Sequence, residues 1–132
     1  MKKLFILVAI FSLVLFTGCS DEKTEDTHYK PSEYKHNIAI GNASRAISDV
    51  NREIISMGAE TSADIVADTY KNSLIKLNEQ LATLEETKNK LSEDKDLTNS
   101  ELTSWTSEYK NTIQGVKNTI KDVERQQTNF LK

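Results

Sequence analysis

Cysteine, proline, glycine and aromatic residues are all scarce in this chain of 132 residues. Cys19 is the only cysteine, so an intramolecular disulfide is excluded and no cysteine cluster is available for a metal. The four glycines are scattered, and neither of the two common glycine-rich phosphate-binding motifs occurs. A nucleophile-elbow sequence is missing as well. We therefore expect no enzymatic activity and no cofactor.

A strong excess of one sign of charge is also missing. The formal net charge is only −3, so the chain lacks the basic surface that binds nucleic acid, and we expect no nucleic-acid partner. Apolar residues are nevertheless frequent and regularly spaced, which argues against a disordered chain. The length indicates a single domain.

The N-terminal segment, MKKLFILVAIFSLVLFTGC, has a pattern of its own. Two lysines precede the apolar run Leu4–Phe16, and two small residues then stand before Cys19. This run is shorter than the roughly 20 apolar residues that a transmembrane helix needs. A charged start, an apolar stretch and a small-residue cleavage site are the features of a secretory signal peptide.

This segment resembles the signal peptide of bacterial lipoproteins. The matching lipobox positions are Thr17, Gly18 and Cys19, and Phe16 stands where leucine is usual. The resemblance implies cleavage after residue 18, a diacylglycerol thioether on Cys19 and acylation of the new N-terminus. Two lipid chains anchor a protein stably where one does not. We expect a protein held at the cell membrane, outside the cytoplasm; an ordinary secretory signal and an uncleaved anchor are the alternatives.

The stretch after Cys19 is acidic and polar, with too little apolar surface to fold alone. We interpret residues 1–18 as the signal peptide, residues 19–31 as the lipidated cysteine and a flexible tether, and residues 32–132 as the folded part. His28 and His36 are the only histidines, and we expect both to be solvated. A metal site would need further ligands, so we expect none.

Everything after Pro31 has the periodicity of helices. Proline is tolerated in the first turn of a helix, so Pro31 suits a helix start. Gly58 can end this helix in the left-handed conformation, and Thr61 or Ser62 can cap the next one. A kink at Gly58 within one long helix is the alternative. The apolar face of the first helix comprises Ile40, Ala43, Ile47, Val50, Ile54 and Met57.

Two more apolar stripes follow, and the second of them has a clear start. Thr98 and Glu101 form a predicted capping box, flanked by Leu97 and Leu102 as a hydrophobic staple. The two stripes share their spacing at an offset of 39 residues, through an internal duplication or because two heptad-like helices align in some register. One stripe comprises Ala63, Val66, Tyr70, Leu74, Leu77, Leu81, Leu84 and Leu91. The other comprises Leu102, Trp105, Tyr109, Ile113, Val116, Ile120, Val123 and Phe130.

These patterns predict an all-α fold, an elongated antiparallel three-helix bundle behind the tether. A short connection makes the last two helices antiparallel neighbours, and the first helix can cover their seam. A helical hairpin with a loosely docked first helix is the alternative.

Two constellations could carry chemistry, and both are better explained by structure. The segment DKDLTNSELTSW has the acidic start of a calcium loop, but Asn99 replaces the required glycine and Trp105 the bidentate glutamate. Trp105 and Tyr109, together with Tyr70, could form an aromatic cluster, which we interpret as core packing with the polar atoms at the rim.

The sequence favours a membrane-anchored interaction module with an envelope protein as its partner, in a role such as exclusion or immunity against conjugation, phage or bacteriocin. A peptide- or amphiphile-binding lipoprotein and a structural envelope spacer are the alternatives. The polar outer faces, rich in threonine and asparagine, could dock the partner. We also expect activity to survive single substitutions of His28, His36, Glu93, Asp94 and Asp96.

Overall fold

The computed structural model describes residues 31–132. The predicted signal peptide, Cys19, residues 20–30 of the predicted tether and His28 lie outside the described residues. The elements are α2 (Pro31–Ser56), α3 (Ala63–Asn89), the short 3-10 helix η2 (Leu91–Glu93) and α4 (Asn99–Leu131). The described part of the chain contains no strand.

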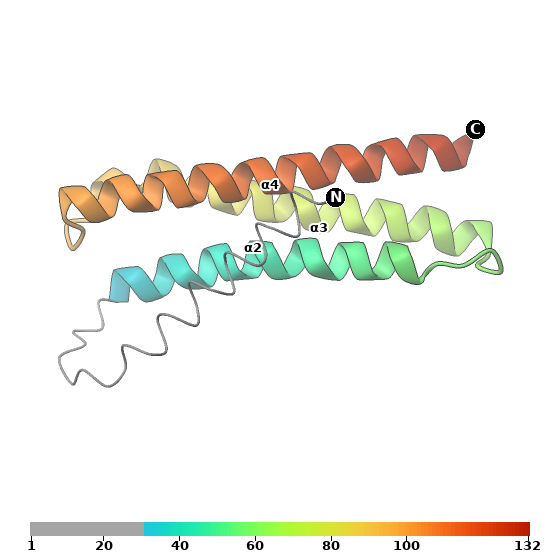
Figure 1. Cartoon of the computed structure of the whole chain (residues 1–132), viewed down its shortest axis with the longest axis horizontal. Coiled ribbons are helices and arrows are strands. Elements are labelled where there is room, and N and C mark those ends of the chain that lie inside the picture. The colour runs from blue at the N-terminus through green and yellow to red at the C-terminus, as the bar shows by residue number, and fades with distance from the viewer. Residues whose placement is uncertain (1–30) are drawn as a thin grey trace.

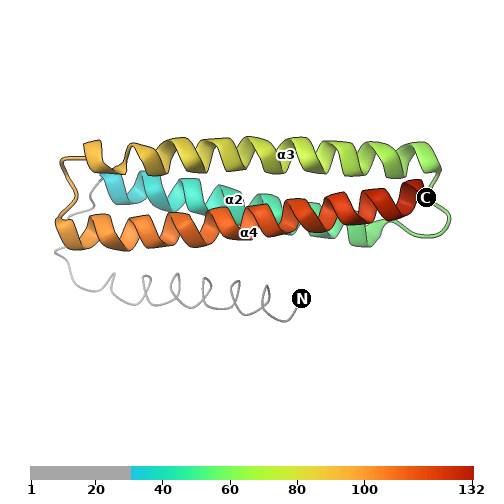
Figure 2. The same cartoon turned by 90° about the horizontal axis from the view of Figure 1, so that it is seen from above.

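The three long helices lie side by side as an elongated antiparallel bundle (Figures 1 and 2). α3 runs opposite to α2 and α4, and each helix packs against the other two. This confirms the predicted three-helix bundle. The start of α2 lies at the same end as the α3–α4 connection, whereas the α2–α3 loop and the C-terminus lie at the opposite end (Figure 1). None of the helices within residues 31–132 combines the length and the apolar character needed to cross a membrane.

The core is one narrow seam to which all three helices contribute. α2 supplies Ile40, Ala43 and Val50, each at most 1% exposed. The first helix is therefore an integral part of the bundle, and the hairpin with a loosely docked first helix is not the fold adopted. The other helices and η2 fill the seam with Val66, Tyr70, Leu77, Leu84, Leu91, Tyr109, Ile113, Val116, Ile120 and Val123.

The predicted apolar stripes are wider than the buried seam. Members at the edges of the stripes are only partly buried. Ala63, the first residue of the α3 stripe, and Phe130, the last residue of the α4 stripe, are exposed. In a bundle of three helices, the other two helices cover only a narrow strip of each helix face. Side chains at the ends of the bundle also have fewer neighbours. The partly buried members are Ile47, Ile54, Met57, Leu74, Leu81, Leu102 and Trp105.

The α2–α3 connection is a true turn, but Gly58 does not end the helix in the predicted way. α2 ends at Ser56, and no glycine among residues 31–132 has a positive φ, so the left-handed conformation predicted for Gly58 is wrong. Gly58 instead exchanges hydrogen bonds with Thr61: its N–H donates to Thr61 Oγ1 and its carbonyl accepts from the Thr61 N–H, both over 3.0 Å. Ser62 then caps α3 by accepting from the N–H of Ile65 at 3.4 Å.

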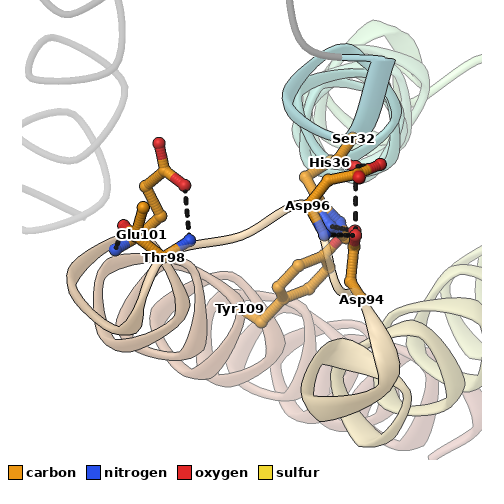
Figure 3. A network of polar contacts seen from close by, with 7 residues as sticks. All are labelled: Ser32, His36, Asp94, Asp96, Thr98, Glu101 and Tyr109. Carbon is orange, nitrogen blue, oxygen red and sulfur yellow. Dashed lines mark hydrogen bonds and ion pairs between the residues drawn. The ribbon is translucent and has the colours of Figure 1, made fainter.

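The capping box predicted for the last helix is confirmed. The Thr98 side chain accepts from the N–H of Glu101 at 3.2 Å, and the Glu101 carboxylate accepts from the N–H of Thr98 at 2.7 Å (Figure 3). Just before it, the Asp94 carboxylate accepts from the N–H of Asp96 at 3.1 Å. The acidic α3–α4 connection is therefore a structured turn whose position is fixed relative to the start of α4.

Candidate functional site

A cluster of polar side chains joins the start of α2 to the α3–α4 connection and to α4 (Figure 3). Ser32 and His36 come from α2, Asp94 and Asp96 from the connection, and Tyr109 from α4. We call these five residues the His36 cluster. Its contacts join residues that are 58 to 73 positions apart in sequence, so it is a product of the tertiary fold.

The helical period of α2 places two of these side chains on its inner face. Ser32, His36 and Ile40 are four positions apart and all three are buried. Within residues 31–39, Ser32 and His36 are the only fully buried side chains, so the start of α2 faces the bundle mainly with polar groups. The aliphatic seam begins only one turn further along.

His36 is held through both nitrogens of its ring. The side chain is 2% exposed, with Nδ1 lying 2.6 Å from the Tyr109 hydroxyl oxygen and Nε2 lying 3.4 Å from Asp94 Oδ2. Because a carboxylate can only accept, we assign the ring proton of neutral His36 to Nε2, and Nδ1 then accepts from the Tyr109 hydroxyl. The rings of Trp105 and Tyr109 lie against the imidazole with centroids at 5.2 and 5.5 Å.

Ser32 adds a second link between α2 and the connection. Its hydroxyl lies 3.1 Å from Asp94 Oδ1 and 3.3 Å from Asp96 Oδ2, so it donates to this pair of carboxylates. Asp94 therefore receives hydrogen bonds from Ser32, from His36 and from the Asp96 N–H. A carboxylate satisfied in this way fixes both the connection and the helix that donates to it.

Burial sets the electrostatics of the cluster. Burial lowers the pKa of His36, and the charge of Lys35 lowers it slightly further. The hydrogen bond to Asp94 and the charge of Asp94 raise this pKa, but they do not outweigh burial. Burial also raises the pKa of Tyr109 to about 12. Burial raises the pKa of Asp94 too, but the hydrogen bonds from the Asp96 N–H, Ser32 and His36 outweigh it and leave this pKa lowered. Near neutral pH the cluster therefore holds a neutral imidazole, a neutral phenol and an ionised Asp94.

The prediction that His36 is solvated is wrong, and the sequence held a signal for its burial. His36 continues the apolar stripe of α2 backwards from Ile40 at helical spacing. The predicted aromatic cluster is wrong in one member. Trp105 and Tyr109 lie together with centroids at 6.4 Å, but Tyr70 contacts Phe130 at 6.1 Å near the opposite end of the bundle. The Tyr109 hydroxyl is buried within the His36 cluster, not at the rim of the core.

An open cleft of about 590 Å³ lies beside the cluster, between the start of α2, the end of α3 and η2. Its walls carry charges of both signs, and Lys90 and Glu86 form an ion pair at 2.7 Å. Among residues 31–132 no group of three or more histidine, cysteine or acidic side chains is placed to hold a metal ion. The charged and titratable residues along the cleft are Lys35, His36, Glu86, Lys90, Glu93 and Asp94.

The geometry of the cluster indicates a structural role, in which it holds the start of α2 against the α3–α4 connection and α4. Both nitrogens of His36 already have partners, and the Ser32 hydroxyl is directed at carboxylates and not at the imidazole. These contacts position the first two turns of α2. No family model, curated protein or solved structure matches the chain, so the interpretation of the site depends on its own contacts.

Proposed function

We propose that this protein is a lipoprotein, anchored outside the cytoplasm by lipid on Cys19, whose three-helix bundle binds another protein of the cell envelope. The observation that carries the proposal is the order of its parts: the lipobox Thr17-Gly18-Cys19, a mostly polar stretch of eleven residues at positions 20–30, and then a rod with a filled core. A peptide- or amphiphile-binding lipoprotein would need a widened core. The seam residues Leu77, Leu84 and Val116 are fully buried instead.

The position of α2 gives the bundle an orientation in this proposal. The tether enters at the end that holds the His36 cluster, because α2 begins there (Figure 1). Eleven extended residues reach at most about 40 Å from the anchor. The helices have 26 to 33 residues, and at the helical rise such lengths span about 40–50 Å. The α2–α3 loop and the C-terminus are then the parts furthest from the membrane.

This far end carries exposed apolar side chains. Ile55 on α2 is 81% exposed, Leu131 on α4 is 71% exposed and Ile65 on α3 is 58% exposed. Figures 1 and 2 both place the end of α2, the start of α3 and the end of α4 at this same end. Tyr34 and Ile38 are also exposed, at the start of α2, but less so than these three. We propose that the far-end side chains contact the partner, because the three most exposed large apolar side chains of residues 31–132 all lie at this end.

The threonines of the outer faces offer a docking partner fewer hydrogen-bond donors than their number predicts. On α3, Thr69, Thr83 and Thr87 each donate the hydroxyl proton to the carbonyl four residues earlier, at 2.7 to 3.0 Å. Thr103 and Thr128 on α4 do the same. A partner at these faces meets threonine methyl groups and hydroxyl oxygens, while the donors are used within the helices.

Site-specific photocrosslinking in intact cells tests the proposal. We place the crosslinking residue at position 55 or 131, and at Ile75 as a matched apolar control, since Ile75 is 48% exposed near the middle of α3. We expect both far-end positions to capture the same envelope protein and the control to capture none of it. Capture should fall when Cys19→Ser removes the anchor. Equal capture from all three positions would contradict docking at the far end, and no capture from any of them would contradict an interaction module and favour a structural spacer.

A further inference from the structure

The first two turns of α2, residues 31–39, are attached to the bundle differently from the rest of that helix. Their buried side chains are Ser32 and His36, which are held by hydrogen bonds, and the His36 ring also lies against Trp105 and Tyr109. From Ile40 onward the buried residues of α2 are apolar: Ile40, Ala43, Ala46 and Val50. Ala39 packs against the core at the end of this segment, but the fully buried contacts of residues 31–39 are those of one hydrogen-bonded cluster.

We propose that protonation of His36 frees residues 31–39 from the bundle and leaves the rest of the three helices folded. Nδ1 of the neutral ring accepts from the Tyr109 hydroxyl over 2.6 Å. A second ring proton turns this acceptor into a donor, so the Tyr109 proton has to turn away inside a site where Tyr109 has no exposed surface. The protonated ring also carries a charge into a position that is 2% exposed.

Some groups around His36 favour the protonated ring, and others oppose it. Asp94 on the connection attracts the imidazolium, and the Trp105 ring adds to this attraction. Lys35 on α2 opposes it, and Tyr109 on α4 is neutral near pH 7. At the end of α3 and in η2, the cleft holds the Glu86–Lys90 ion pair and Glu93. Burial outweighs the attraction by Asp94, so the neutral ring is favoured in the docked state.

The sign of the pH dependence follows from this balance. A histidine whose pKa is lowered in the docked state contributes stability above its ordinary pKa of 6.5. That contribution is lost as the pH falls through the lowered value. Acidification therefore weakens the docking of residues 31–39, whereas the buried residues of α2 from Ile40 onward have no titratable side chain.

Release would lengthen the connection between membrane and bundle, a consequence that rests on the proposed function. As helix, nine residues span about 14 Å at the usual rise. As extended chain, nine residues reach about 30 Å. A lipid-anchored bundle would then extend further from the membrane in an acidic medium.

Hydrogen–deuterium exchange of the purified full chain in detergent tests the release itself. Rates are measured between pH 7.5 and 5 and corrected for the intrinsic pH dependence of amide exchange. We expect protection of residues 35–39 to fall several-fold with a midpoint below pH 6.5, while residues 66–84 of α3 keep theirs. The NMR titration of the His36 ring should have the same midpoint. Gain of protection on acidification, joint loss in all helices, or a different His36 midpoint would overturn the proposal.

Two substitutions assign the effect to His36. His36→Gln keeps one acceptor and one donor but does not titrate, so protection of residues 35–39 should no longer depend on pH in this range. Lys35→Gln is the matched control on an exposed neighbour, and it should keep the pH response. A response that persists in His36→Gln contradicts the proposal. If His36→Gln frees the segment at every pH, the agreement of the two midpoints in the unsubstituted chain decides the question. None of these readouts depends on lipid, so they fail or succeed independently of the proposed function.

Discussion

At the scale of single residues, the most unusual side chain of the core is Ser73. Among residues 31–132 its hydroxyl is the one buried side-chain polar atom without a hydrogen-bond partner, and Ser73 has no exposed surface. An unpaired buried hydroxyl lowers stability because it has lost its water without gaining a partner. Ser73 therefore weakens the seam between Tyr70 and Leu77, where it lies on the buried face of α3.

We expect Ser73→Ala to stabilise the protein. The substitution removes the unpaired hydroxyl and adds a better helix former, which should raise the free energy of unfolding by about 1 kcal/mol. Ser32→Ala is the matched control, since it removes a hydroxyl that donates to Asp94 and Asp96, and it should lower the same quantity. Urea unfolding of both variants at pH 7.5 gives the comparison. A loss of stability in Ser73→Ala would show that its hydroxyl has a partner.

Tyr109 is expected to make the protein sensitive to alkali. Its pKa is raised to about 12, above its ordinary value of 10.0, so its contribution to stability is complete below pH 10 and is lost as the pH rises toward 12. Tyr109→Phe should be less stable at pH 7.5, by about 1–3 kcal/mol, because Nδ1 of His36 loses its donor. Its stability should then change less between pH 10 and 11.5. Urea unfolding at the three pH values measures both effects, and an equal alkaline loss in Tyr109→Phe would contradict this account.

At the scale of the elements, α3 shows how narrow the seam is. Leu84 is fully buried, whereas Leu81, three residues earlier on the same helix, is only partly buried. The two leucines have the same side chain and the same helical context. Substituting each leucine in turn therefore separates the contribution of the seam to the free energy of unfolding from the contribution of its edge.

We expect Leu84→Ala to cost about 2–5 kcal/mol of the free energy of unfolding, as buried leucines do. Leu81→Ala should cost clearly less, because part of its side chain remains in water in the folded state. Urea unfolding of the two variants, together with their far-UV circular dichroism, makes the comparison. Equal losses would mean that the seam is wider than the structure shows.

The elements could be predicted from the sequence because their signals are local. The apolar stripe of the first helix, the turn after residue 56 and the Thr98–Glu101 capping box each depend on residues within a few positions of one another. The conformation of Gly58 was predicted wrongly because Thr61 supplies a side-chain acceptor that makes a left-handed glycine unnecessary. The stripes also do not show how much of each helix face the other two helices cover.

The site was less predictable than the elements. His36 lies in register with the buried face of α2, but hydrophobic periodicity counts only apolar residues. Its burial depends on Tyr109 and Asp94, which are 73 and 58 positions away in sequence. Which of these groups meet is set by the axial register of the three helices, and the sequence pattern leaves that register open.

At the scale of the whole molecule, the structure gives the bundle two different ends. One end has the His36 cluster and the start of α2, and the other has the exposed side chains of Ile55 and Leu131 (Figure 1). A tether that ends at Pro31 would orient the rod with the second end outward. The proposed function therefore depends on whether the chain is anchored at Cys19.

Labelling with a fatty acid, followed by membrane fractionation, tests this anchor most directly. We expect the unsubstituted chain to take up the label and to sediment with the membranes. Cys19→Ser should lose the label and remain as an unprocessed precursor or appear as soluble protein, because the sulfur that forms the thioether is gone. Thr24→Ala, a matched substitution within the tether, should behave like the unsubstituted chain. Label retained in Cys19→Ser, or no label in the unsubstituted chain, would contradict the lipoprotein.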